Sequence, residues 1–162
     1  MKQKYLHNSG LLALLALLGM TAPLSTDMYM PSMPTIANEF NTGSSALSFT
    51  LVIFNLFLAI GVLLFGPVSD KYGRKKPLLT SVILFFISNI LCFLSFNIEF
   101  MIMVRALQGL GAGGMTSLSL AIVKDYFKAE RRGTIIAVLQ SFTIIGPVIA
   151  PLLGALILQF AP

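Results

Sequence analysis

The chain has 162 residues, of which 56% are hydrophobic and only 10% are charged, and its mean hydropathy is +0.88. A soluble domain carries about 25% charged residues, so the composition excludes a soluble globular protein and indicates an integral membrane protein. The net charge of +5 comes from basic residues scattered between apolar runs. This distribution does not suit nucleic acid, and the bilayer is the expected partner.

Five apolar stretches are long enough to cross a bilayer, and none alternates with the period of two that membrane strands show. They cover residues 10–30, 46–66, 78–96, 100–123 and 134–158. The pattern predicts an all-α membrane protein, a transmembrane helix bundle in which residues 1–162 form a single domain.

The first stretch also has features of a signal peptide, because Lys2 and Lys4 precede the apolar run Leu11–Met20 and the small residues that follow it. Pro23 lies directly after the candidate cleavage site, and apolar character continues beyond it. We therefore expect a retained span.

The connections between the stretches differ sharply in charge. Those at positions 31–45 and 97–99 contain Glu39 and Glu99 but neither Lys nor Arg. Every basic residue except Arg105 lies before the first stretch, after the second or after the fourth: Lys2, Lys4, Lys71, Arg74, Lys75, Lys76, Lys124, Lys128, Arg131 and Arg132. By the positive-inside rule the N-terminus is cytoplasmic.

Arg105 is an expensive charge inside the fourth stretch. At a helix centre an arginine costs at least about 2.5–3.5 kcal/mol on insertion scales, so it requires a partner or a polar cavity. Gln108, three residues later, shares its helix face. The other polar residues within the spans, Asn55, Asn89 and Gln140, are expected to serve as interhelical hydrogen-bond partners.

Asp27 is the second charge within the expected spans, near the outer end of the first. The depth of Arg105 is similar, so the two can pair or can share one aqueous cavity. A carboxylate in such a place is suited to carrying a proton. The alternative is that Asp27 lies in the interface, one turn before Pro31 and Pro34 end the helix.

The segment from Gly66 to Lys76 predicts a tight cytoplasmic turn. Gly66 and Gly73 allow close approach or positive φ, and Asp70 can accept from backbone or basic donors. The basic run also suits anionic lipid. In the fifth stretch, Pro147 and Pro151 remove backbone donors and predict a bent helix that lines a cavity or moves against a neighbour.

The glycines at 109, 111, 113 and 114 formally match a dinucleotide-binding pattern, but they lie within a spanning helix. Gly109 and Gly113 instead predict close helix packing. His7 is the only histidine, and Cys92 is the only cysteine. Without a metal-ligand cluster, we expect neither an enzyme, nor a metal, nor a cofactor.

At four segments the sequence resembles the major facilitator superfamily, specifically its drug:proton antiporter branch and the bicyclomycin/chloramphenicol-resistance subgroup. Residues 66–75 are similar to the G-x-L-a-D-r-x-G-r-k signature, with Val68 and Ser69 in place of Leu and Ala. Residues 105–112 are similar to R-x-x-q-G-x-g-a. Residues 26–34 resemble the span-one signature of the subgroup, and residues 146–154 resemble the antiporter signature of span five.

The resemblance implies multidrug efflux, with drug moving out and protons moving in across the bacterial inner membrane. Small amphipathic drugs would be the substrates. The proton-coupling and substrate cavity would contain Asp27, Arg105 and Gln108. The cytoplasmic gate would contain Gly66, Asp70, Gly73, Arg74 and Asp125, with Asp125 the expected partner of Arg74. The antiporter-helix motif would comprise Gly146, Pro147, Pro151 and Gly154.

The family fold has two six-helix halves, and this sequence accounts for most of the N-terminal one. We therefore expect a fragment that lacks the sixth span and the C-terminal half, and that is inactive without that half as a partner. The alternative is a self-standing five-span membrane protein that acts as an oligomer or interaction component.

Overall fold

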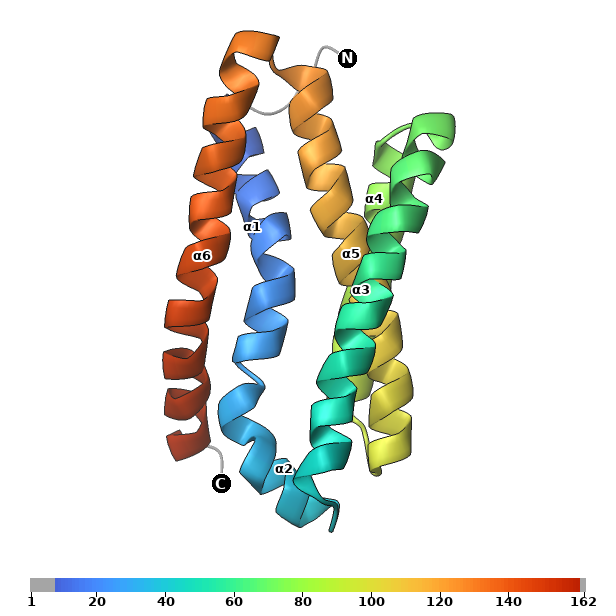
Figure 1. Cartoon of the computed structure of the whole chain (residues 1–162), viewed down its shortest axis with the longest axis vertical. Helices are drawn as coiled ribbons and strands as arrows, with labels where there is room; N and C mark the ends of the chain where they lie inside the picture. The colour runs from blue at the N-terminus through green and yellow to red at the C-terminus, as the bar shows by residue number, and fades with distance from the viewer. Residues whose placement is uncertain (1–7, 161–162) are drawn as a thin grey trace.

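The computed structural model describes residues 8–160, with the side chains of residues 10–156, and this part of the chain consists of helices joined by short turns, without strands (Figure 1). Five of the helical segments are long and apolar enough to cross a membrane, which confirms the predicted fold class. The elements are α1 (Asn8–Asp27), η1 (Met30–Ser32), α2 (Met33–Glu39), α3 (Ser44–Tyr72), α4 (Lys75–Phe93), α5 (Ile98–Tyr126) and α6 (Ala129–Phe160).

Three helices extend beyond the predicted spans at their charged ends. The α3 helix continues to Tyr72, α5 continues to Tyr126, and α6 begins at Ala129. Backbone hydrogen bonding continues where hydropathy falls, because long charged side chains at a helix end can reach water. Gly66 therefore lies inside α3 and not in a turn, and no atom lies within 4 Å of the position of its missing Cβ. The expected close approach at Gly66 is wrong.

The first span differs most from its prediction, because the structure divides it. The α1 helix ends at Asp27, and a turn at Met28 and Tyr29 leads into η1 and then α2. Pro31 and Pro34 occupy the first turns of these two short helices. Proline is favoured at a helix start and cannot donate in a helix interior, so the two prolines end one helix and begin the next.

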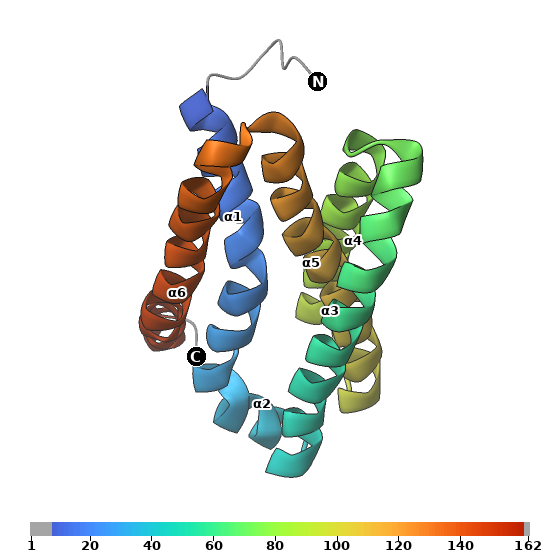
Figure 2. The same cartoon turned by 45° about the horizontal axis from the view of Figure 1, so that its top comes forward.

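The α5 helix is the most buried element and lies between two pairs of helices (Figures 1 and 2). It packs most extensively against α3 and then α4, while α1 packs against α6 and also contacts α5. A Cβ on Gly109 would collide with the Phe54 carbonyl of α3, and one on Gly113 with the Leu58 carbonyl. The glycine pattern therefore permits close helix packing, as expected from the sequence.

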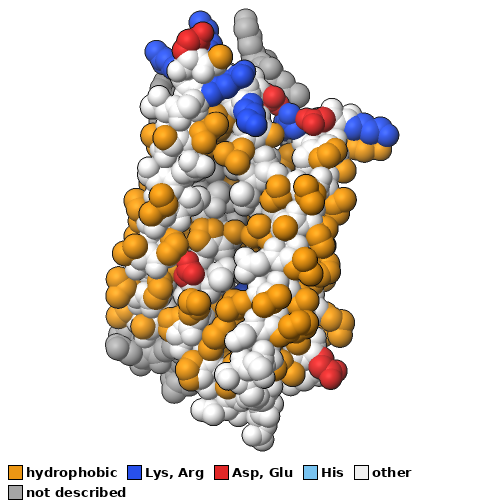
Figure 3. Space-filling model, in the orientation of Figure 1, with side chains coloured by type: hydrophobic (Ala, Val, Ile, Leu, Met, Phe, Trp, Pro, Cys, Tyr) orange, Lys and Arg blue, Asp and Glu red, His pale blue; other side chains and the backbone are white. Residues whose placement is uncertain are grey.

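One end of the bundle is strongly basic. Figure 3 shows Lys and Arg side chains gathered at the end where α3 turns into α4 and α5 into α6, with hydrophobic side chains along the length of the helices. We call this the basic end, and it contains Lys71, Arg74, Lys75, Lys76, Lys124, Lys128, Arg131 and Arg132. Lys2 and Lys4, which contribute to the predicted orientation, lie outside the described residues, as does His7.

Candidate functional site

Arg105 is buried in the middle of the bundle, with only 4% of its surface exposed. Its Nη1 donates to Gln108 Oε1 at 3.1 Å and to the backbone carbonyl of Ser25 at 3.3 Å. Gln108 is one turn further along α5, so the sequence spacing is enough to explain that contact. Ser25 is in the last turn of α1, where helix carbonyls have no intrahelical donor and attract positive charge.

Tyr29 covers the guanidinium from the turn that follows α1. The Cζ atom of Arg105 lies 4.0 Å from the centroid of the Tyr29 ring, a cation–π geometry. The Thr50 hydroxyl of α3 lies 3.3 Å from the Tyr29 hydroxyl, and both residues are buried. Sequence reasoning did not identify Tyr29 as a partner of Arg105, although it belongs to the same signature as Asp27.

The polar network extends from α5 to α4. Gln108 Nε2 donates to Asn89 Oδ1 at 3.0 Å, so Asn89 has the interhelical role expected from the sequence. Asn89 itself is exposed on α4 and also donates to the Phe85 carbonyl at 2.7 Å. Arg105 Nε is the buried side-chain nitrogen that lacks a hydrogen-bond partner among the described residues. The guanidinium is thus incompletely satisfied by protein acceptors within that part of the chain.

Asp27 does not pair with Arg105. It is the last residue of α1 and is partly exposed, and no ion pair or hydrogen bond joins it to Arg105 within residues 10–156. Of the two arrangements that the sequence allowed, direct pairing is absent from this structure. Asp27 nevertheless lies two residues from the Ser25 carbonyl that receives the arginine.

A second polar cluster lies at the basic end. Arg74 pairs with Asp70 at 2.7 Å and with Asp125 at 2.7 Å, and it also donates to the buried Ser69 hydroxyl. The hydrogen bond to Asp125 is the main cause that raises the pKa of Arg74 above its usual range. Gly73, with a φ of 82°, provides the left-handed turn that places Arg74 at the start of α4. The cluster therefore joins α3, α4 and α5.

The residues of the antiporter-helix motif lie along α6, where the helix continues through both Pro147 and Pro151. A Cβ on Gly154 would lie 2.8 Å from the Met28 carbonyl, which belongs to the turn directly after Asp27. The nearest neighbour of a Cβ on Gly146 would be Pro23 at 3.6 Å, an ordinary contact. Gly154 is therefore the motif glycine at which close packing against the first span depends on a missing side chain.

Comparison with known proteins gives the chain a family. The model of the Major Facilitator Superfamily matches residues 15–162. The MFS-type transporter YdgK of Bacillus subtilis is 42% identical over 150 residues, which cover 91% of this chain and 37% of YdgK. The multidrug resistance protein MdtL of Salmonella paratyphi C is 32% identical over 140 residues, covering 86% of this chain and 35% of MdtL. The MdtL of Escherichia coli O139:H28 is 34% identical over 140 residues, which cover 86% of this chain and 36% of that MdtL.

The fold is also found among solved structures. An inward-facing crystal structure of a bacterial homolog of the human lysosomal transporter Spinster gives a TM-score of 0.81 at 21% identity, covering 94% of this chain and 33% of the other. This likeness supports the fold alone. The chain spans little more than a third of the length of the curated relatives given above. On these grounds, this multi-pass membrane protein belongs to the Major Facilitator Superfamily.

Proposed function

We propose that the chain forms the N-terminal helices of a proton-coupled multidrug efflux transporter of the bicyclomycin/chloramphenicol-resistance subgroup. The observation that carries this proposal is the carboxylate of Asp27, which forms no ion pair with any described residue and lies at the break in the first span, two residues from the Ser25 carbonyl that receives buried Arg105. Two relatives of the chain are named multidrug resistance proteins, which supports drugs as the class of substrate.

In this proposal Asp27 carries the proton. Arg105 stays charged and favours the ionised form of a nearby carboxylate, so that a proton taken from outside is released again after transport. Gln108 and Tyr29 hold the guanidinium in place from two sides, at 3.1 Å and 4.0 Å. Small amphipathic drugs would bind in a cavity bordered by the first span and α5 in the complete transporter.

The remaining candidate residues would control access to that cavity. The ion pairs of Arg74 with Asp70 and Asp125 would form part of the cytoplasmic gate, and α6 would support the first span through Gly154. The basic end would face the cytoplasm of a bacterial inner membrane, with the N-terminus on the same side. Each inward proton would then gain about 2.3 kcal/mol per 100 mV of membrane potential.

A chimera tests the proposal. The matching N-terminal segment of Escherichia coli MdtL is replaced by this chain, and export of a fluorescent MdtL substrate is measured in cells that lack other exporters. The chimera should export the drug only while a proton gradient exists. Asp27→Asn should abolish export, while the conservative change Asp125→Glu should retain most of it.

Membrane levels of each variant are measured on the same cells, so that loss of insertion is distinguished from loss of transport. A chimera that reaches the membrane and exports drug equally well with Asn at position 27 would show that Asp27 does not couple protons. The chain by itself should export nothing. Export by this chain alone, dependent on Arg105, would support a self-standing transporter.

A further inference from the structure

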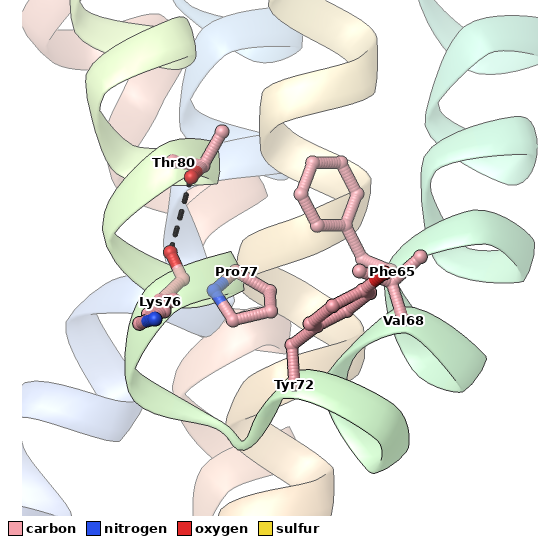
Figure 4. A pocket seen from close by; sticks show the side chains of 6 residues that line it. All are labelled: Phe65, Val68, Tyr72, Lys76, Pro77 and Thr80. Carbon is pink, nitrogen blue, oxygen red and sulfur yellow. Dashed lines mark hydrogen bonds between the residues drawn. The ribbon is translucent and has the colours of Figure 1, made fainter.

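A groove of about 200 Å³ lies at the basic end, between the end of α3 and the start of α4 (Figure 4). Phe65, Val68 and Tyr72 line it from α3, and Lys76, Pro77 and Thr80 line it from α4. Figure 4 shows Pro77 facing the ring of Tyr72 across the groove. Neither the proposed proton site nor the Arg74 cluster includes any of these residues.

The interior of the groove is apolar. Phe65, Val68 and Tyr72 recur at the three- and four-residue spacing that places side chains on one face of a helix. Pro77 has no backbone N–H, and the Thr80 hydroxyl donates to the Lys76 carbonyl at 3.1 Å. Apart from the Lys76 ammonium, the side-chain polar group of the α4 wall is therefore already satisfied, and the interior of the groove suits a hydrocarbon chain.

The rim of the groove carries unbalanced positive charge. Lys76 lines it directly, Lys75 precedes it, and the Lys71 ammonium lies 5.5 Å from the centroid of the Tyr72 ring. Asp70, the nearest acid in the sequence, is paired with Arg74. Across the part of the chain that the structure describes, none of the three lysines forms an ion pair. The rim therefore suits an anion.

Apolar side chains continue from the groove along the two helices toward the middle of the bundle. Leu64 of α3 is 54% exposed and Leu79 of α4 is 57% exposed, and both lie on membrane-length helices. A ligand that fits all three features has a hydrocarbon chain running parallel to the helices and a negative group at the level of the lysines. A phospholipid with an anionic headgroup has this shape.

We propose that the groove between α3 and α4 binds an anionic phospholipid of the surrounding leaflet. The part of an acyl chain nearest the headgroup would pack against Val68, Tyr72 and Pro77, and the phosphate would lie at Lys76. This site does not depend on the proposed transport activity. The bound lipid would hold the end of α3 and the start of α4 together from the lipid-facing side of the bundle.

The absence of tryptophan from the sequence allows a clean measurement. Tyr72→Trp places one fluorescent ring in the groove wall of the full chain, reconstituted in liposomes of zwitterionic phosphatidylcholine, which add no other tryptophan. A small, equal fraction of either brominated phosphatidylglycerol or brominated phosphatidylcholine is then added as a quencher. Phosphatidylglycerol should quench the reporter more strongly. Lys76→Gln should reduce the local enrichment of phosphatidylglycerol at the reporter about fivefold, which is the effect of one lysine at a membrane surface.

Two controls separate a site from general attraction to the basic end. Lys128→Gln removes the same charge from the same end of the bundle, where Lys128 is also exposed, and should leave the enrichment unchanged. A reporter at Phe96, which is 78% exposed at the opposite end, should be quenched equally by both lipids. Equal quenching by both lipids at position 72 would overturn the proposal. So would an equal loss of enrichment in Lys76→Gln and Lys128→Gln, since that result indicates surface potential alone.

Discussion

At the scale of single residues, the structure distributes the cost of one buried charge over several partners. Arg105 is compensated by a side-chain oxygen, a helix-terminal carbonyl and an aromatic face, and not by the carboxylate of Asp27. Asp27 itself forms no ion pair within residues 10–156, which is compatible with the proton-carrying role proposed above.

The Tyr29 ring gives the first prediction. Tyr29→Phe retains the ring over Arg105 and loses only the hydroxyl that contacts Thr50, so it should lower the free energy of unfolding by about 0.6 kcal/mol. Tyr29→Leu also removes the cation–π contact, and should cost a further ~1–2 kcal/mol because the guanidinium is desolvated. Unfolding by SDS in mixed micelles measures both. Equal values for the two variants would contradict the role given to the ring.

The Arg74 cluster gives the second prediction, and it concerns pH. The pKa of Arg74 is raised in the folded state. The stability that its interactions contribute is therefore fully present below the ordinary arginine pKa, and it is lost only as pH rises through the higher pKa of the folded state. Both values lie far above neutrality. Arg74→Gln should therefore cost the same at about pH 6 and about pH 9.

The size of that cost should be small and sensitive to salt. Asp70 and Asp125 are 67% and 51% exposed, so solvent screens both pairs, and the loss should not exceed about 1 kcal/mol. It should shrink further at high ionic strength. Both expectations, a cost independent of pH and a cost that falls with salt, can be measured directly. The free energy of unfolding of Arg74→Gln is compared with that of the parent at two pH values and two salt concentrations. A cost that changes between the two pH values would be inconsistent with the cluster as described.

Local spacing explains which of these contacts the sequence could predict. Gln108 is three residues from Arg105 on one helix, and any helix brings the two together. The pairing of Arg74 with Asp125 was expected only from the family resemblance. Ser25 and Tyr29 contact Arg105 because the first span breaks at residues 28–29 and packs against α5. The periodicity of a single sequence predicts neither the position of that break nor the packing.

At the scale of elements, glycines on α5 set how closely the helices approach. The third prediction compares two glycines that both lie in helices. Gly113→Ala would force a methyl group into the Leu58 carbonyl of α3 and should destabilise the chain by about 1–3 kcal/mol. Gly66→Ala meets open space and should stabilise it by about 0.5–1 kcal/mol, since alanine loses less entropy on helix formation. Unfolding in mixed micelles should show changes of opposite sign in the free energy of unfolding of the two variants. A decrease in both would show that α3 is not packed as described.

The α6 motif gives the fourth prediction, again with a matched pair. Gly154→Ala places a methyl group 2.8 Å from the Met28 carbonyl and should displace the turn that follows Asp27, whereas Gly146→Ala makes an ordinary contact at 3.6 Å. In the MdtL chimera, drug export should fall at least about tenfold in Gly154→Ala, a barrier change of roughly 1.4 kcal/mol, and little in Gly146→Ala. Equal tolerance of both changes would rule out a role for this contact in export.

The helices themselves were predictable, but their ends and the break were less so. Hydropathy identified five spans because the bilayer requires about 20 apolar residues in each. It placed the end of the second at residue 66, six residues early, because the charged last turn of α3 is helical and yet not apolar. It also treated residues 10–30 as one helix, since apolar character continues through the turn at Met28 and Tyr29.

At the scale of the whole molecule, the charge distribution predicts which end of the bundle faces the cytoplasm. The fifth prediction tests the orientation. In a chain with Cys92→Ser, a cysteine introduced at Lys128 should react with a membrane-impermeant maleimide only after cells are opened. A cysteine at Asn97, at the opposite end of the bundle, should react in intact cells. The reverse pattern would place the N-terminus outside.

The break in the first span has a consequence for energetics. It places the carboxylate, the carbonyl that binds Arg105 and the Tyr29 ring within five residues, at a joint between two helices. If protons bind there and drugs shift the same joint, the two events share one coupling free energy. Linkage then requires reciprocity: the factor by which a proton changes the affinity for drug equals the factor by which drug changes the affinity for the proton. Measuring one of the two affinities with and without the other ligand therefore gives the coupling factor for both.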